Sequence, residues 1–269
     1  RTILEAQDIR NSGWNYTDST GNSKITCSFY ARSNKAGTYC FAFRSVDATG
    51  NMYYVKEFTL VADTWTRVII TIPSNSSLVF DNNANAGAIL SISLQAGSGR
   101  NNATDDTWNT SDTSLATANQ VNFFDDTANN FFLTGWQLEV GSVTPFEHRS
   151  FGEELALCQR YYFKIQADGS ADTFAMGSVI NSTTSDHNVF FPVQMRASPT
   201  AIETSGTASD YSIFTDGFAT TNSSVPSFTR ATAMTAYYRS VVSSGLTTGK
   251  AGIHRGLNSN AFLAWESEI

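Results

Sequence analysis

A polar segment near the middle of the chain combines carboxylates with a tryptophan, a mixture that suits sugar binding. The segment runs Arg100-Asn-Asn-Ala-Thr-Asp-Asp-Thr-Trp-Asn109. An aromatic face stacks on a sugar ring, while carboxylate and amide groups hydrogen-bond to its hydroxyls. We therefore take four side chains as candidates for glycan binding: Asp105, Asp106, Trp108 and Asn109. The alternative, which we favour for Trp108, is that its ring packs beneath its own loop or at a subunit contact.

Residue types that catalyse reactions or bind metals are present but form no motif. The three histidines are far apart in the sequence: His148, His187 and His254. No Cys or His pair has zinc-binding spacing, and the doublets Asp105-Asp106 and Asp125-Asp126 lack the spacing of an EF-hand. A glycosidase needs two carboxylates roughly 5–10 Å apart. We predict no catalytic residue, no metal ligand, no cofactor and no enzymatic activity, and leave a structural calcium ion open.

Composition excludes several classes of partner. The net charge is −7, and neither half of the chain has a basic cluster, so no nucleic-acid partner is expected. No run approaches 18 consecutive apolar residues, so no membrane insertion is expected. The start, Arg1-Thr-Ile-Leu-Glu5, lacks the pattern of a signal peptide and resembles the middle of a longer protein.

The three cysteines do not predict a disulfide framework, because their number is odd and their spacing irregular. We expect free, buried thiols, with a bridge between Cys27 and Cys40 across a hairpin as the alternative. Cys158 is expected in the core, within the apolar stripe of a helix. Free thiols fit assembly in a reducing cytoplasm.

Alternation of apolar and polar residues predicts an all-β fold. Within residues 24–32, the apolar side chains from Ile25 to Ala31 occupy every second position and share one face. Trp65 and Trp136 lie in similar patterns, so we expect both in the core. The strands predicted in the first half are 24–32, 38–44, 52–60, 65–72, 88–94 and 131–140, with one long loop at 100–119.

One helical stretch separates two β-rich halves. Ser150 and Glu153 have capping-box spacing, and apolar residues from Leu155 to Tyr162 recur at helical intervals. The strands predicted after it are 174–180, 188–192, 227–236, 237–242 and 261–266. We expect a β-sandwich at 1–149, a helical junction at 150–163 and a smaller β-sandwich at 164–269.

The segments around this helix resemble a junction in phage and prophage tail-fibre and virion-appendage proteins. The resemblance rests on Thr134-Gly-Trp-Gln-Leu-Glu-Val-Gly-Ser142, Thr144-Pro-Phe-Glu-His-Arg149 and Glu154-Leu-Ala-Leu-Cys-Gln-Arg-Tyr-Tyr162, and further matches extend it over nearly the whole chain. It implies that the first domain is jelly-roll-like, as in carbohydrate-binding modules, and that the chain assembles as a homotrimer. Relatives carry more chain before Ile3, which supplies the first strands. If those strands are absent, a neighbouring chain must cover the exposed sheet edge.

The resemblance implies a structural component of a bacteriophage virion, assembled in the host cytoplasm. We expect a tail fibre or receptor-binding appendage that contacts other virion tail proteins and the host surface, including a bacterial surface glycan. The alternatives are a purely architectural virion protein (a head fibre, decoration protein or tail adaptor) and an appendage enzyme that cleaves polysaccharide. Five residues of the junction are candidates for subunit contacts: Glu153, Glu154, Gln159, Arg160 and Tyr161. Alternatively, the helix only plugs the base of one domain.

Overall fold

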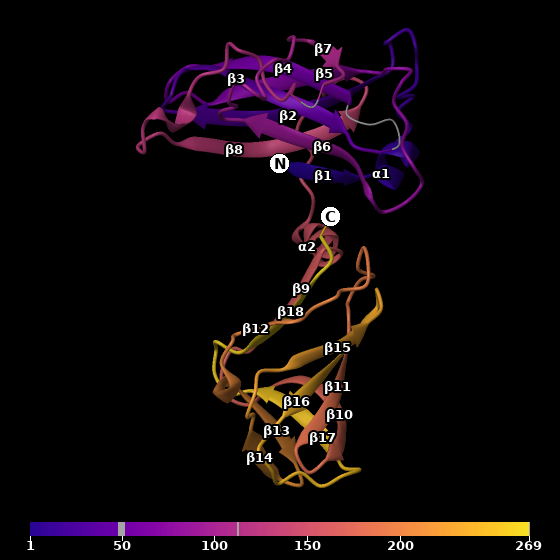
Figure 1. Cartoon of the computed structure of the whole chain (residues 1–269), viewed down its shortest axis with the longest axis vertical. Coiled ribbons are helices and arrows are strands. Elements are labelled where there is room, and N and C mark those ends of the chain that lie inside the picture. Colours follow the sequence, from indigo (N-terminus) through magenta and orange to yellow (C-terminus); the bar gives the residue numbers. More distant parts are fainter. Residues whose placement is uncertain (48–51, 112, 269) are drawn as a thin grey trace. The chain divides into compact units, whose positions relative to one another are not determined.

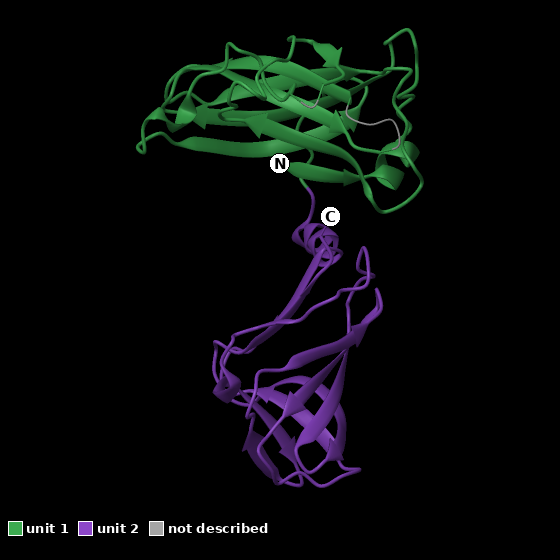
Figure 2. Cartoon of the chain, viewed as in Figure 1, with its two compact units in different colours: residues 1–148, 269 green, residues 149–268 purple. Residues whose placement is uncertain are grey.

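The computed structural model describes residues 1–47, 52–111 and 113–268 (Figure 1). These residues divide into two compact units, residues 1–148 (unit 1) and 149–268 (unit 2), shown in Figure 2. In each unit, antiparallel sheets enclose a separate hydrophobic core. The prediction of an all-β sandwich fold is therefore confirmed.

The described strands of unit 1 form two antiparallel sheets. In sheet order, the first consists of β1 (Thr2–Glu5), β6 (Ala86–Ser93), β3 (Gly37–Ser45), β4 (Met52–Leu60) and β7 (Thr107–Asn109). The second consists of β5 (Thr66–Pro73), β2 (Lys24–Ser33) and β8 (Phe131–Val140). Helix α1 (Ala6–Asn11) follows β1, and the 3-10 turn η1 (Phe123–Asp125) precedes β8. The six strands predicted in this half correspond to β2–β6 and β8.

The core of unit 1 lies between these sheets, because each strand directs alternate side chains to opposite faces. Phe29 of β2 stacks on Trp136 of β8, with ring centroids 5.2 Å apart, and meets Phe58 of β4 edge-on at 5.5 Å. Such pairs contribute about 0.5–1.5 kcal/mol beyond the burial of their area. Trp136 packs on the core as predicted. Trp65 is 48% exposed, so its prediction as a core residue is wrong.

Residues 100–111 and 113–119, within the segment 100–119 predicted as one long loop, cover the outer face of the first sheet. Strand β7 lies within this segment and pairs with β4. The backbone N–H of Asp106 donates to the carbonyl of Val55 at 2.8 Å, and Ala116 is buried together with Cys40 of β3. Because the edge of β4 provides hydrogen-bond partners for the backbone of this segment, a polar segment can pack here. The prediction that this segment is only a loop is therefore wrong for residues 107–109, which form β7.

The cysteines are free thiols, as the favoured prediction states. Cys27 and Cys40 lie in different sheets, on β2 and β3, so they do not face each other across a hairpin. Burial raises the pKa of Cys27 to about 12 and also raises the pKa of Cys40, so both remain protonated at neutral pH. Cys158 is exposed, and its prediction as a core residue is wrong.

The described strands of unit 2 also form two antiparallel sheets. In sheet order, the larger consists of β14 (Phe218–Thr221), β13 (Tyr211–Thr215), β17 (Ala251–Gly256), β10 (Asp172–Asn181), β11 (Thr184–Phe190), β16 (Thr235–Val241) and β15 (Ser227–Ala231). The smaller consists of β12 (Glu203–Thr204), β18 (Phe262–Glu266) and β9 (Tyr162–Gln166), and the 3-10 turn η2 (Ala208–Asp210) precedes β13. The core between them centres on Trp265, which is fully buried and contacts Phe163 and Phe191. A turn at 232–234 separates β15 from β16, so the predicted strand 227–236 is wrong.

Helix α2 (Phe151–Gln159) begins at the predicted capping box. The N–H of Glu153 donates to Ser150 Oγ at 3.3 Å, and the N–H of Ser150 donates to Glu153 Oε2 at 2.9 Å. The helix is shorter than the predicted junction 150–163, because β9 begins at Tyr162. No residue of α2 is buried within the described chain, which is why Cys158 is exposed. No helix of the described residues has the length and apolar character needed to cross a bilayer.

Two histidines lie side by side in the interior of unit 2. His187 of β11 and His254 of β17 are both fully buried, with ring centroids 5.2 Å apart. His254 Nδ1 bonds the hydroxyl of Tyr238, while neither ring nitrogen of His187 has a partner among the described residues. Burial lowers the pKa of His187 to about 4, against a smaller opposing effect of the neighbouring Asp186. Burial and the charge of His187 hold the pKa of His254 well below its usual range.

We expect acid to destabilise unit 2 before unit 1. The unfolded chain binds protons at histidine below pH about 6.5, whereas the folded state does not until pH about 4, so stability falls as the pH drops through this window. His187 alone accounts for about 3 kcal/mol. Hydrogen exchange measured by mass spectrometry from pH 7 to 4.5 should show faster global exchange in peptides of unit 2 than in those of unit 1. His187→Gln should flatten this dependence and the exposed control His148→Gln should not. Equal pH dependence in both units would contradict the assignment.

Candidate functional site

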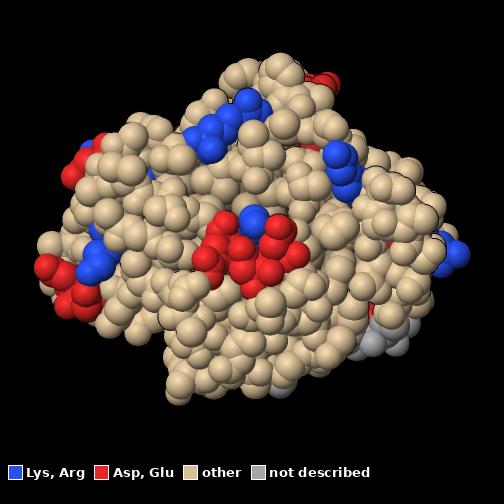
Figure 3. Space-filling model, turned by 90° about the horizontal axis from the view of Figure 1, so that it is seen from above, with Lys and Arg blue, Asp and Glu red and all other residues tan. Residues whose placement is uncertain are grey.

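The acidic residues predicted to bind glycan form ion pairs within unit 1. Lys56 Nζ lies 3.5 Å from Asp105 and 3.0 Å from Asp106, and Tyr54 donates a hydrogen bond to Asp106. Figure 3 shows one compact acidic group surrounding a basic side chain on the face that it displays. The bond from Tyr54 and then that from Lys56 lower the pKa of Asp106. Asp105 also accepts the backbone N–H of Glu57 at 2.7 Å. These carboxylates hold their segment on β4.

Trp108 and Asn109 complete the same local network. The Trp108 ring lies 5.9 Å from Phe43 and 5.5 Å from Tyr54 between centroids, and its indole N–H donates to the carbonyl of Pro73 at 3.2 Å. The side chain of Asn109 bonds backbone groups of its own segment. The structure therefore brings the four predicted residues together, and Trp108 packs beneath its segment, which is the alternative that we favoured.

The outer face of the second sheet presents aromatic side chains that the sequence analysis did not select. Phe132 of β8 lies opposite Arg32 of β2. Trp65 immediately precedes β5, whose first residue, Thr66, lies opposite Ala31 of β2. The Trp65 and Phe132 rings are 6.5 Å apart between centroids, and each is 48% exposed. Tyr30, in the next row of the sheet, is 39% exposed. We call Trp65, Arg32, Phe132 and Tyr30 the aromatic face.

Strand parity explains why these residues face solvent. On β5, Val68 and Ile70 point into the core, so Trp65 falls on the opposite face together with Arg67. On β2, Phe29 points inward and Tyr30 outward. Following the alternation of side chains in β2 and in the segment 65–72, rather than the hydrophobicity of each residue, would have placed Tyr30 and Trp65 on the outer face from the sequence.

Charged groups border the aromatic face. The guanidinium carbon of Arg32 lies 5.9 Å from the centre of the Phe132 ring, a cation–π arrangement. The same guanidinium pairs with Asp63 at 3.1 Å. Arg67 donates to the carbonyl of Thr144 at 2.8 Å. Exposed rings beside these donors and acceptors provide a surface for stacking and hydrogen bonding together.

A bulge in β8 sets the shape of this face. The register shifts between Ser28 and Tyr30 on β2, and the extra residue on β8 is Gly135, with a φ of 61°. A Cβ at this position would lie 3.2 Å from the Tyr30 ring and 3.9 Å from the Phe146 ring. Glycine is therefore required both by the left-handed backbone and by the close approach of Tyr30.

The residues that carry the resemblance to virion appendages form a clamp on the chain after β8. Gln137 Nε2 donates to Thr144 Oγ1 at 3.1 Å, and Gln137 Oε1 accepts the N–H of Glu147 at 2.8 Å. Glu139 accepts both the N–H and the hydroxyl of Thr144, at 2.9 and 2.7 Å. The sequence Gln-Leu-Glu, followed by Thr-Pro-Phe-Glu, thus folds residues 144–147 back onto the outer face of β8.

The five predicted junction residues do not form one cluster. Glu153 caps α2, and the exposed Glu154 pairs with Arg149 at 3.2 Å. At the other end of the helix, the carbonyl of Arg160 accepts the N–H of Arg196, and that of Tyr161 accepts the N–H of Ser267. Gln159 is the last residue of the helix. Arg160 and Tyr161 therefore tie the end of α2 to unit 2 through their backbones.

No metal-binding cluster is present among the described residues. No group of three or more His, Cys, Asp or Glu side chains could hold a metal ion there. A polar pocket in unit 2 includes one carboxylate, Asp210, and an apolar groove in unit 1 includes none.

Comparison with known proteins adds no family assignment. No protein-family model matches the sequence, and no curated protein is significantly similar to it.

Replacing Gln137 should release the clamp without unfolding unit 1. In Gln137→Ala the bonds to Thr144 and Glu147 are lost, so residues 141–149 should exchange their amide hydrogens faster and be cleaved sooner by proteases. The loss in stability should be about 1 kcal/mol, because the side chain is at the surface. Thr134→Ala, on the same strand, is the matched control. Unchanged protease sensitivity in Gln137→Ala would show that the clamp does not restrain this segment.

Proposed function

We propose that this chain is a non-enzymatic structural protein of a bacteriophage virion, a tail fibre or receptor-binding appendage. In this proposal unit 1 binds a bacterial surface glycan through the aromatic face. The observation that carries the proposal is the pair of exposed rings, Trp65 and Phe132, beside the half-buried Arg32. The resemblance of residues 134–162 to the junction of virion appendages supports the assignment to a virion.

The chemistry of the aromatic face suits a sugar. Trp65 and Phe132 offer ring surfaces on which the C–H face of a sugar can stack, and Arg32 with Asp63 supplies donors and acceptors for its hydroxyls. The rings belong to adjacent hydrogen-bonded strands or their ends, so little side-chain freedom is lost on binding. A purely architectural virion protein would instead use this face to contact another protein, since Trp, Tyr and Arg are also enriched in protein interfaces.

Removing the two rings should abolish most of the glycan affinity. The double variant Trp65→Ala/Phe132→Ala loses two stacking contacts of about 1 kcal/mol each, which together correspond to about 30-fold weaker binding. The measurement is binding to an array of purified bacterial capsules, lipopolysaccharides and teichoic acids. Val61→Ala, also exposed but outside the face, is the control.

A wild-type chain that binds no glycan on this array, or a double variant that binds as well as wild type, would contradict the proposal. Retained binding by the double variant would place the sugar site elsewhere. Absence of glycan binding together with capture of another virion protein through Trp65 and Phe132 would support the architectural alternative.

The exposed helix α2 supports self-association. Phe151, Leu155 and Cys158 follow one another at spacings of four and three residues, and all three are exposed. This spacing is that of the apolar seam in helical bundles. We propose that three copies pack these stripes around a common axis, because a closed symmetric contact hides apolar surface from water.

Light scattering tests this arrangement directly. The wild-type chain should have a mass near three times 29.3 kDa. Leu155→Glu places a charge in the seam and should yield monomers, whereas Glu154→Gln, on a neighbouring side of the helix, should remain trimeric. A monomeric wild-type chain would rule out trimer formation through α2.

A further inference from the structure

A polar pocket of about 630 Å³ lies in unit 2, on the outer face of the small sheet formed by β12, β18 and β9 (Figure 1). Strand β9 contributes Lys164 and Gln166, and β18 contributes Phe262. The core-facing residues of the same strands, Ile165 and Leu263, point the other way. The walls come from two turns, residues 205–210 and 258–260. A pocket of this size is typical of small-molecule sites.

Hydrogen bonds hold both turns in place around the pocket. The side-chain amide of Asn258 donates to Asp210 Oδ1 at 2.8 Å, which ties the second turn to the first. The hydroxyl of Tyr211 accepts the N–H of Ser205 at 2.9 Å and donates to the carbonyl of Phe262 at 2.7 Å, which ties the first turn to the sheet. The walls are therefore ordered before a ligand arrives, so little conformational freedom is lost on binding.

Polar groups of the pocket keep unused hydrogen-bonding capacity among the described residues. Asp210 is 8% exposed, and only its Oδ1 has a partner there. Lys164 Nζ forms no ion pair with a described carboxylate and lies 4.2 Å from the centre of the Phe262 ring. In Thr207 and Asn260, the described hydrogen bonds use the backbone N–H and leave the side chain free. A buried carboxylate with an unused oxygen is costly unless a ligand or water completes its bonds.

We propose that this pocket binds a neutral sugar residue. A sugar hydroxyl can donate to Asp210 and another can accept from Lys164, while Thr207 and Asn260 both donate and accept. The half-buried Phe262 ring offers apolar contact to the C–H groups of the sugar. The proposal goes beyond glycan binding by the aromatic face and does not depend on it, because the two sites lie in different units.

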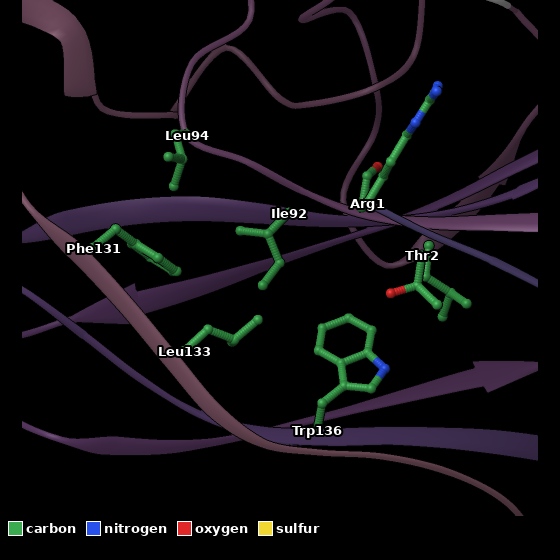
Figure 4. A pocket seen from close by; sticks show the side chains of 9 residues that line it. Arg1, Thr2, Ile92, Leu94, Phe131, Leu133 and Trp136 are labelled. Carbon is green, nitrogen blue, oxygen red and sulfur yellow. The ribbon is translucent and has the colours of Figure 1, made fainter. Parts of the chain in front are cut away.

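The lining of the pocket distinguishes a sugar from other ligands. Figure 4 shows the pocket of unit 1, whose labelled side chains, such as Ile92 and Leu133, are mostly apolar and would leave hydroxyls without partners. In the polar pocket of unit 2, a phosphate or sulfate would meet the charge of Asp210 with Lys164 as its one cationic partner. A calcium ion takes about six to eight oxygen ligands, and Lys164 opposes it. No group of three or more His, Cys, Asp or Glu side chains in the described part of the chain could hold a metal ion.

Saturation-transfer NMR titrations of the full chain test the proposal. The probes are the methyl glycosides of glucose, galactose, mannose and N-acetylglucosamine, and at least one should bind saturably. Lys164→Met keeps the side-chain stem and removes the charge, and Asp210→Asn keeps an oxygen for Asn258 and removes the charge. Each should bind that glycoside about tenfold more weakly, because a hydrogen bond to a charged group is lost. Lys250→Met, which removes an exposed cation paired with Asp216 outside the pocket, is the matched control and should bind as wild type.

A second variant locates the site without removing a charge. Thr207→Trp, at an exposed position of the wall, fills the pocket and should abolish binding of the glycoside. Hydrogen exchange at residues 205–210 and 258–262 should slow when wild type is saturated with the glycoside. A polysaccharide that displaces the glycoside would identify a surface glycan as the source of the sugar, whereas displacement by free sugars alone would identify a soluble one.

Several results would overturn the proposal. They are a wild-type chain that binds none of the four glycosides, wild-type affinity in both Lys164→Met and Thr207→Trp, and tighter binding of methyl glucuronide than of methyl glucoside. Loss of the glycoside in Trp65→Ala/Phe132→Ala but not in Thr207→Trp would also overturn it, by placing the sugar on the aromatic face. The two proposals fail separately, because the double variant should retain the glycoside and Thr207→Trp should retain array binding through the aromatic face.

Discussion

The bulge at Gly135 is the constraint on which the surfaces of unit 1 depend. Along a regular strand, every second side chain faces the core. The extra residue at the bulge shifts this alternation by one position in β8. Before the bulge Phe131 faces the core and Phe132 the solvent. After it Trp136 faces the core and Gln137 the solvent. One strand thus closes the core along its length, contributes a ring to the aromatic face and anchors the chain that leaves unit 1.

Local alternation was sufficient to predict most strands of unit 1, because a half-buried strand has apolar residues on its core face and polar residues on its solvent face. It was not sufficient to assign Trp65. Trp65 was expected in the core because a tryptophan is usually buried. Its position two residues before the outward-facing Arg67 instead places it on the outer face. The general lesson is that an apolar residue on the polar side of an otherwise well-patterned strand is a candidate for binding. The expectation that a tryptophan in a strand pattern is buried held for Trp136 and failed for Trp65.

Other features depend on contacts between distant residues and leave no local pattern. The segment 100–119 is polar, and only its pairing with β4 gives it a place in the fold. Strand β17 includes Gly252, Gly256 and His254, a composition with weak preference for strands, and its neighbours β10 and β13 hold it in the sheet. Of the predicted apolar stripe from Leu155 to Tyr162, only Leu155 and Cys158 lie within α2, because the helix ends at Gln159 and Tyr162 belongs to β9.

The apolar surfaces of this molecule differ in what their backbone can offer, and this difference separates their roles. The aromatic face lies on a sheet whose hydrogen bonds are already made, so only its side chains are available, and these favour a ligand with ring faces and hydroxyls. The backbone groups in the middle of a helix such as α2 are already hydrogen-bonded within the helix. Its exposed apolar side chains can therefore be stabilised only by packing against another surface.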